Sequence, residues 1–117
     1  MMRSNRVLVW IAGLLLRVEV QGPSMLPTLA PGERLLVHRT KRVRGGDIVV
    51  IVDPSNRTRT LVKRVSSVLD DAVLVVGDNP RASRDSAEFG PVAKTLLVGR
   101  AWYRYFPPDS RKRLRRH

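Results

Sequence analysis

Residues 48–52 read Ile-Val-Val-Ile-Val, an unbroken run of β-branched side chains, and this run constrains the fold more than any other stretch. Such side chains lose rotamer freedom in a helix and fit well on a pleated strand. Because the run is apolar at every position and not at alternate ones, it predicts a strand buried on both faces. Turn-forming sequences bound the run on both sides, Gly45-Gly46-Asp47 before it and Asp53-Pro54-Ser55-Asn56 after it.

Further strand patterns follow at close spacing, and no stretch shows the periodicity of a long helix. Between residues 77 and 92 turn-forming residues replace the apolar pattern, which predicts an ordered loop. We therefore predict a mostly β, compact fold of several short antiparallel strands with coil and little helix. The other predicted strands cover residues 18–20, 33–39, 60–69, 72–76 and 95–106, the last with Gly99 as a candidate bulge.

The amino-acid composition limits the kinds of partner and the kinds of site that the chain can have. The 117 residues include 22 Lys or Arg and 10 Asp or Glu, a net charge of +12 that favours anionic partners such as nucleic acid or an anionic membrane. The chain has no cysteine, which excludes a disulfide framework, a thiolate metal site and a cysteine nucleophile. His38 and His117 are too far apart in sequence to indicate a metal site, so we expect no metal and no cofactor.

The two ends differ from the centre. Residues 1–17 have a basic start and an apolar run from Val7 to Leu16, too short for the roughly twenty residues of a membrane span. The run predicts either a packed first helix or strand, or a segment in a membrane interface with Trp10 as an anchor. Residues 18–108 would form the main domain, and the basic residues 109–117 are expected to be a disordered tail.

A proline-stiffened loop and an unusual lysine carry the chemistry. Ser24 lies in Gly22-Pro23-Ser24-Met25-Leu26-Pro27-Thr28-Leu29, where two prolines disfavour helix and central strand and can fix a hydroxyl in place. In a strand over residues 61–65, Lys63 shares a face with Leu61 and Val65. Desolvation between them would lower the pKa of Lys63 and make it a general base, which a serine nucleophile needs.

Each of these residues also has an ordinary interpretation. Ser24 could be a turn serine that bonds its own backbone. Lys63 could be an edge-strand lysine, or its amine could reach water along the stem. Basic residues near Trp102, Tyr103 and Tyr105 could bind nucleic acid by charge and stacking, although no recognised nucleic-acid motif is present.

Four segments, in order, resemble the boxes of one family: the type I signal peptidases and their relatives, the S26 serine endopeptidases with a Ser/Lys dyad. The segment 22–29 resembles the nucleophile box, and Gly46-Asp47-Ile48-Val49-Val50 the box that follows. Lys63-Arg64-Val65 is similar to the box that carries the general base. Gly77-Asp78-Asn79 with Ser83, Asp85-Ser86 and Gly90-Pro91-Val92 is similar to the last box.

The resemblance implies a role for each matched residue. Ser24 would attack the scissile carbonyl, Lys63 would take its proton, and the Ser24 backbone N–H would donate to the oxyanion. Ser83 would orient the lysine, and Asp78 and Asp85 would support the site. Met25 and Pro27 would lie beside the substrate pocket.

Two departures from the pattern concern the support of the site. Gly22 stands where some members have a serine as second oxyanion donor, a type of group whose removal can cost about 10²–10³ in rate. Ala87 stands where the family has an arginine, which leaves the role of Asp85 open.

The function predicted from the sequence is removal of an N-terminal signal or propeptide from a precursor protein. The compact motif set most resembles the maturation proteases of nickel-type superoxide dismutase precursors. A minimal membrane-associated type I signal peptidase is the alternative. A basic β-domain that binds nucleic acid or anionic membrane without catalysis is the alternative of another class. The expected partners are the precursor and an anionic membrane surface, without specific nucleic acid, and the expected location is cytoplasmic or peripheral to the cytoplasmic membrane.

Overall fold

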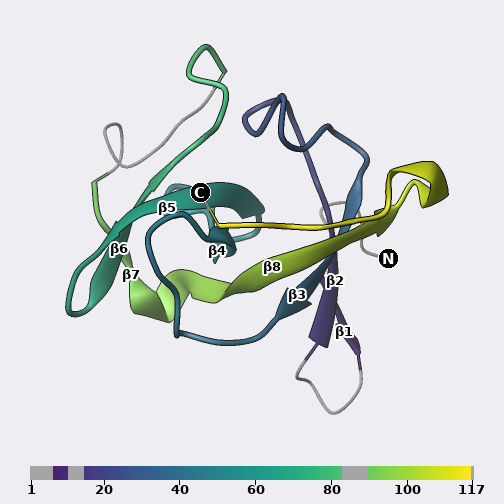
Figure 1. The fold of residues 1–117 in the computed structure, drawn as a ribbon. Helices are drawn as coiled ribbons and strands as arrows, with labels where there is room; N and C mark the ends of the chain where they lie inside the picture. The colour runs from purple at the N-terminus through teal and green to yellow at the C-terminus, as the bar shows by residue number, and fades with distance from the viewer. Residues whose placement is uncertain (1–6, 11–14, 83–89, 117) are drawn as a thin grey trace.

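The structure, a computed structural model, describes residues 7–10, 15–82 and 90–116. They form one strongly curled antiparallel sheet with the strand order β1-β2-β3-β8-β4-β5-β6-β7, and β9 pairs with β8 (Figure 1). Only two short 3-10 turns interrupt the strands in the part of the chain described, so the mostly β prediction is confirmed. The strands are β1 (Val7–Trp10), β2 (Leu15–Glu19), β3 (Arg34–His38), β4 (Ile48–Val52), β5 (Thr60–Val68), β6 (Ala72–Val76), β7 (Val92–Ala93), β8 (Leu97–Phe106) and β9 (Lys112–Arg113), and the turns are η1 (Lys94–Leu96) and η2 (Pro108–Ser110).

β4 lies at the centre of the sheet between β5 and β8, as the β-branched run predicts. Its first four residues are at most 2% exposed. Ile48 and Val50 pack into a first apolar cluster, whereas Val49 and Ile51 pack into a second cluster on the other face. One strand thus contributes to two cores, because successive side chains point to opposite faces.

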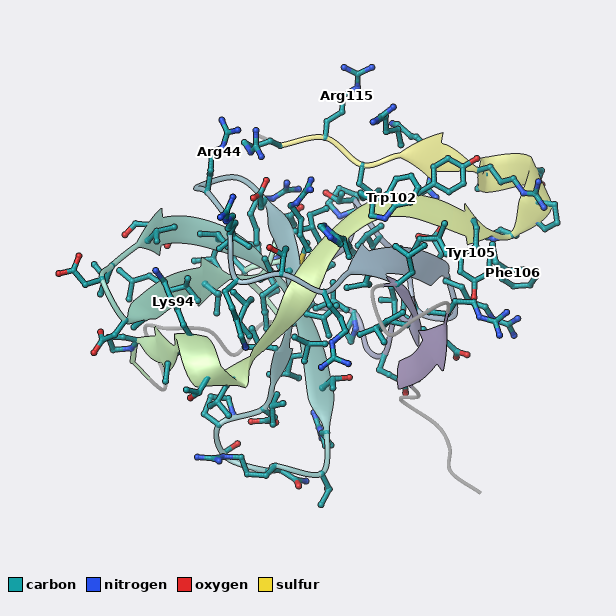
Figure 2. The ribbon with its side chains drawn as sticks, turned by 90° about the horizontal axis from the view of Figure 1, so that it is seen from below. Arg44, Lys94, Trp102, Tyr105, Phe106 and Arg115 are labelled. Carbon is teal, nitrogen blue, oxygen red and sulfur yellow. The ribbon has the colours of Figure 1, made fainter. Side chains whose placement is uncertain are left out.

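β8 begins directly after η1, which contains Lys94, and crosses the sheet to its end at Phe106 (Figure 2). It pairs with β3, β4 and β9. Its register against β4 shifts between the pairs Val50–Gly99 and Ile51–Leu97, an irregularity next to the predicted bulge. A Cβ at Gly99 would lie 2.3 Å from the carbonyl oxygen of His38. Glycine is therefore needed here because the backbones approach too closely for a side chain.

The ends of the chain are also part of the sheet. β1 pairs with β2, so residues 7–10 take the strand alternative for the N-terminal apolar run. The described residues include no helix of the length and hydrophobicity needed to cross a membrane.

The C-terminal residues differ from the expectation of a disordered tail. Lys112 and Arg113 pair with β8, the Leu114 N–H donates to the Trp102 carbonyl oxygen at 2.9 Å, and the Leu114 side chain packs against the first cluster. The Arg116 Nε donates to Asp47 Oδ1 at 2.6 Å. The apolar side chain of Leu114 and the buried carboxylate of Asp47 hold this segment in place. A count of charges in the sequence detects neither contact.

Candidate functional site

The segment around Ser24 is held at both ends. Val20 and the turn at Gly32 and Glu33 close its base, with Val20 N–H to Glu33 O at 2.8 Å and Gly32 N–H to Val20 O at 2.9 Å. Within it, Met25 and Leu29 are 1% and 0% exposed and pack into the first cluster. The half-buried Ser24 therefore sits directly before an apolar anchor, in a segment of turns that no helix or strand includes.

Lys63 lies in the middle of β5 and is only 2% exposed, the largest fully buried side chain in the described part of the chain. Val49 of β4 is its cross-strand partner. Its neighbours Leu61 and Val65 pack with the second cluster, whereas Val62 packs with the first. The alternation of faces predicted for this strand is thus observed, and the lysine lies on a covered surface.

The Asp78-Asn79 turn that follows β6 connects the Ser24 loop to β5. The Asn79 N–H donates to the Ser24 carbonyl oxygen at 2.9 Å, and Asn79 Nδ2 donates to the Pro23 carbonyl oxygen at 3.1 Å. The carboxylate of Asp78 accepts from Arg64, the residue after Lys63, through Nε at 3.0 Å and Nη2 at 2.6 Å. In Figure 1 the Ser24 loop and the chain after β6 project from the same end of the molecule.

Asp78 reaches the Ser24 segment as well, because the Thr28 hydroxyl donates to its Oδ2. The Arg64 side chain is 9% exposed and that of Asp78 is 16% exposed, so the ion pair is largely removed from water. Arg64 Nη1 donates to the Gly46 carbonyl oxygen at 2.9 Å, which ties the turn before β4 to the same junction. The Ser24 segment, the turn before β4, strand β5 and the turn after β6 thus meet at the Arg64–Asp78 ion pair.

Sequence patterns alone indicate no role for Arg64, Thr28 or Asn79. The register of the β5–β6 hairpin explains the first omission: Arg64 pairs with Val76, and Asp78, two residues further, falls diagonally opposite Arg64 on the same face. A register shift between Val65 and Ser67 prevents a count back from the turn from finding this pair. The signal available in the sequence was an arginine on one arm of a predicted hairpin and an aspartate two residues beyond the end of the other arm.

The other residues predicted for the site differ in burial, and two of them are not described. Ser83 and Asp85 lie outside the described residues. Met25 is buried in the first cluster, whereas Pro27 is exposed and borders a cavity next to the C-terminal segment. The Ser24 carbonyl oxygen accepts a hydrogen bond from the Asn79 N–H at 2.9 Å. No three His, Cys, Asp or Glu side chains gather among the described residues in a way that could hold a metal ion.

Fold and site together define a small β domain in which a serine loop is connected to a strand that carries a buried lysine. Residues 5–73 match the family described as "Signal peptidase, peptidase S26". The chain belongs to this family.

Curated relatives agree with this assignment. Mitochondrial ATP-independent inner membrane protease subunit 1b of Arabidopsis thaliana is 40% identical over 113 residues, covering 74% of this chain and 67% of the relative. Subunit 1a of the same plant is 33% identical, covering 77% of this chain and 70% of the relative. Mitochondrial inner membrane protease subunit 2 of Mus musculus is 34% identical, covering 81% and 69%. The family and these names support a peptidase similar to signal peptidases.

Proposed function

We propose that this protein is a serine endopeptidase in which Ser24 is the nucleophile and Lys63 the general base, and that it removes an N-terminal segment from a precursor protein. The observation that carries the proposal is the junction at Asp78-Asn79, which binds the Ser24 backbone on one side and the residue after Lys63 on the other. Family membership gives the reaction class, hydrolysis of a peptide bond.

In the proposed reaction the Ser24 Oγ attacks the scissile carbonyl carbon while Lys63 Nζ accepts the hydroxyl proton. The carbonyl oxygen becomes an oxyanion that accepts a hydrogen bond from the Ser24 N–H. Lys63 then returns the proton to the leaving amine, which leaves an acyl-enzyme that water hydrolyses with Lys63 again as base.

The burial of Lys63 supports its role as base. An ammonium that is 2% exposed is disfavoured relative to the neutral amine, and only the neutral amine can accept the proton. Ser83 and Asp85 remain proposed as supporting residues, with Ser83 orienting the amine.

The precursor we propose is that of a nickel-type superoxide dismutase, because the compact motif set resembles its maturation proteases. A minimal membrane-associated signal peptidase is the second candidate, favoured by the inner-membrane proteases among the relatives. We also propose that the protein works at an anionic membrane surface, in keeping with its charge of +12.

The test is cleavage by purified full-length protein of two substrates: the nickel superoxide dismutase precursor and a library of peptides from a proteolysed proteome. Ser24→Ala and Lys63→Met should each abolish cleavage. The matched controls are Ser110→Ala, a serine that is also half-buried, and Lys94→Met, a lysine that bonds the Asp70 carbonyl oxygen, and both should retain it. Cleavage that survives Ser24→Ala in folded protein refutes the dyad, and cuts in the library alone refute the named precursor.

A further inference from the structure

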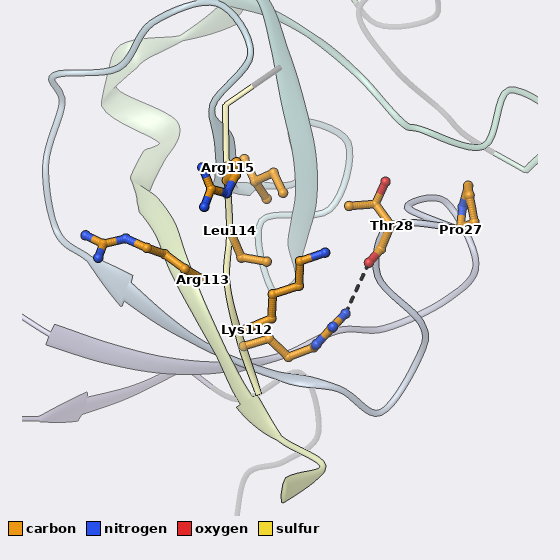
Figure 3. A pocket seen from close by; sticks show the side chains of 8 residues that line it. Pro27, Thr28, Lys112, Arg113, Leu114 and Arg115 are labelled. Carbon is orange, nitrogen blue, oxygen red and sulfur yellow. Dashed lines mark hydrogen bonds between the residues drawn. The ribbon is translucent and has the colours of Figure 1, made fainter. Parts of the chain in front are cut away.

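A cavity of about 360 Å³ lies between the C-terminal segment and the Ser24 loop (Figure 3). One wall is the Pro27-Thr28 stretch, which follows the nucleophile position by only three to four residues. Four cationic residues also line the cavity: Arg104, Lys112, Arg113 and Arg115. In Figure 3 the Lys112 side chain points toward Thr28, whereas the Arg113 side chain points away from it.

Within residues 7–10, 15–82 and 90–116, three of the four cations form no ion pair with a carboxylate. Arg104 is paired with Glu33 at 3.3 Å and also donates to the Thr28 carbonyl oxygen at 3.3 Å. Among the described residues, no ion pair involves Lys112, Arg113 or Arg115. Cationic side chains that lie close together repel one another and destabilise the fold unless an anion binds between them.

The cations are held by the fold. Lys112 and Arg113 are fixed in β9 by pairing with β8, and Leu114 packs into the first cluster beneath them. Arg116 beyond them is paired with the buried Asp47. Arg115 projects to the same side of the molecule as Arg44 (Figure 2).

We propose that this cavity binds an acidic side chain of the precursor, within about four residues of the scissile bond, and so contributes to cleavage specificity. The inference rests on the proposed function. Guanidinium groups bind carboxylates through paired hydrogen bonds, and Lys112 adds a positive charge that faces Thr28, so the lining suits an anionic side chain.

The distance follows from chain geometry. Thr28 is four residues from Ser24, so their Cα atoms are at most about 14 Å apart. An extended substrate advances about 3.3 Å per residue, so about four residues span the way from Ser24 to the cavity. Thr28 takes part in both places, since its hydroxyl bonds Asp78 at the junction and its carbonyl oxygen bonds Arg104 at the cavity.

The cavity variant is Lys112→Gln, Arg113→Gln and Arg115→Gln combined. The matched control is Arg39→Gln, Arg42→Gln and Arg57→Gln combined, which removes the same charge from exposed arginines that do not line the cavity. With both, the peptide library from the cleavage assay is digested and its cut sites are mapped by mass spectrometry. Wild-type protein and the control should show cuts enriched in Asp or Glu within about four positions, and the cavity variant should lose that enrichment.

Binding gives a readout that does not need cleavage. In the Ser24→Ala background, two fluorescent peptides that differ only in Glu-Glu or Gln-Gln are titrated by anisotropy. The Glu peptide should bind at least about tenfold more tightly, and the cavity variant should remove most of this preference while the control keeps it. Inorganic phosphate should compete with the Glu peptide.

The outcomes separate the two proposals. Cuts without acidic enrichment, or equal losses in cavity variant and control, overturn the cavity proposal and leave the peptidase standing. If wild-type protein makes no cuts beyond the Ser24→Ala background, the proposed function fails, and the peptide titration alone decides the anion site. Vesicles of phosphatidylcholine with and without phosphatidylglycerol provide the last arm. If the cavity variant loses vesicle binding but keeps its preference for the Glu peptide, the cavity binds lipid headgroups and the proposal is wrong.

Discussion

Replacing Asp78 by alanine should destabilise the fold by about 3 kcal/mol, because it leaves the arginine at the junction without its counter-ion. Asp78 accepts two hydrogen bonds from Arg64 and one from Thr28. Breaking a buried pair from one side costs about 3–5 kcal/mol, and the 16% exposure of Asp78 admits water and favours the lower end. For a domain of this size, 3 kcal/mol corresponds to a melting temperature lower by about 12 °C.

The assay is urea unfolding followed by tryptophan fluorescence and circular dichroism. Glu19→Ala is the control, because the Glu19–Arg34 pair is 3.9 Å long with side chains 39% and 47% exposed. Exposed pairs of this kind contribute about 0.2–1 kcal/mol at most, so this variant should unfold close to wild type. A double-mutant cycle with Arg64→Met isolates the interaction.

The double variant should be more stable than the sum of the single losses predicts, by about 2 kcal/mol, because neither charge is then left unpaired. If the two losses add, or if Asp78→Ala costs no more than Glu19→Ala, the pair does not hold the junction together. The connection we draw between β5 and the Ser24 loop would then be wrong.

Four further predictions concern other positions. Lys63→Met should abolish cleavage because the general base is lost, while circular dichroism should still show a folded domain; cleavage that survives in the folded variant would contradict this. Cleavage by wild-type protein should rise with pH with an apparent pKa below the roughly 10.4 of a free lysine, because burial favours the neutral amine; a rate profile that follows an unperturbed lysine would count against Lys63 as a desolvated base. Gly99→Ala should lower the free energy of unfolding by at least about 2 kcal/mol, because the new Cβ would meet backbone 2.3 Å away. Gly22→Ala, at φ +72° in open space, should cost only about 1 kcal/mol. Equal losses in the two variants would be inconsistent with the close backbone approach at Gly99. Deleting residues 112–117 should cost about 2–3 kcal/mol in urea unfolding, through loss of Leu114 burial and of the Arg116–Asp47 pair; unchanged stability would show that the segment does not pack.

Local pattern was sufficient where one element decides its own structure. The β-branched run at 48–52 became the doubly buried β4, and the alternation at 61–65 placed Lys63 on a covered face. The serine loop followed from its prolines and glycine, which restrict the backbone whatever surrounds them. The order of four short motifs was enough to indicate the peptidase family.

The sequence alone determined the strands β3, β4, β5, β6 and β8, the family and the two residues proposed for the chemistry, because backbone preference and side-chain alternation act over a few residues. Tertiary structure decided what joins them: the Arg64–Asp78 pair depends on the register of one irregular hairpin, and the Asn79 bonds to the Ser24 loop span more than fifty residues. It also decided that a basic C-terminus lies against the sheet as β9 and Leu114, with cations facing the loop of the proposed nucleophile. Charge and composition predict a disordered tail here, but packing against a particular strand and a particular carboxylate fixes where the segment lies.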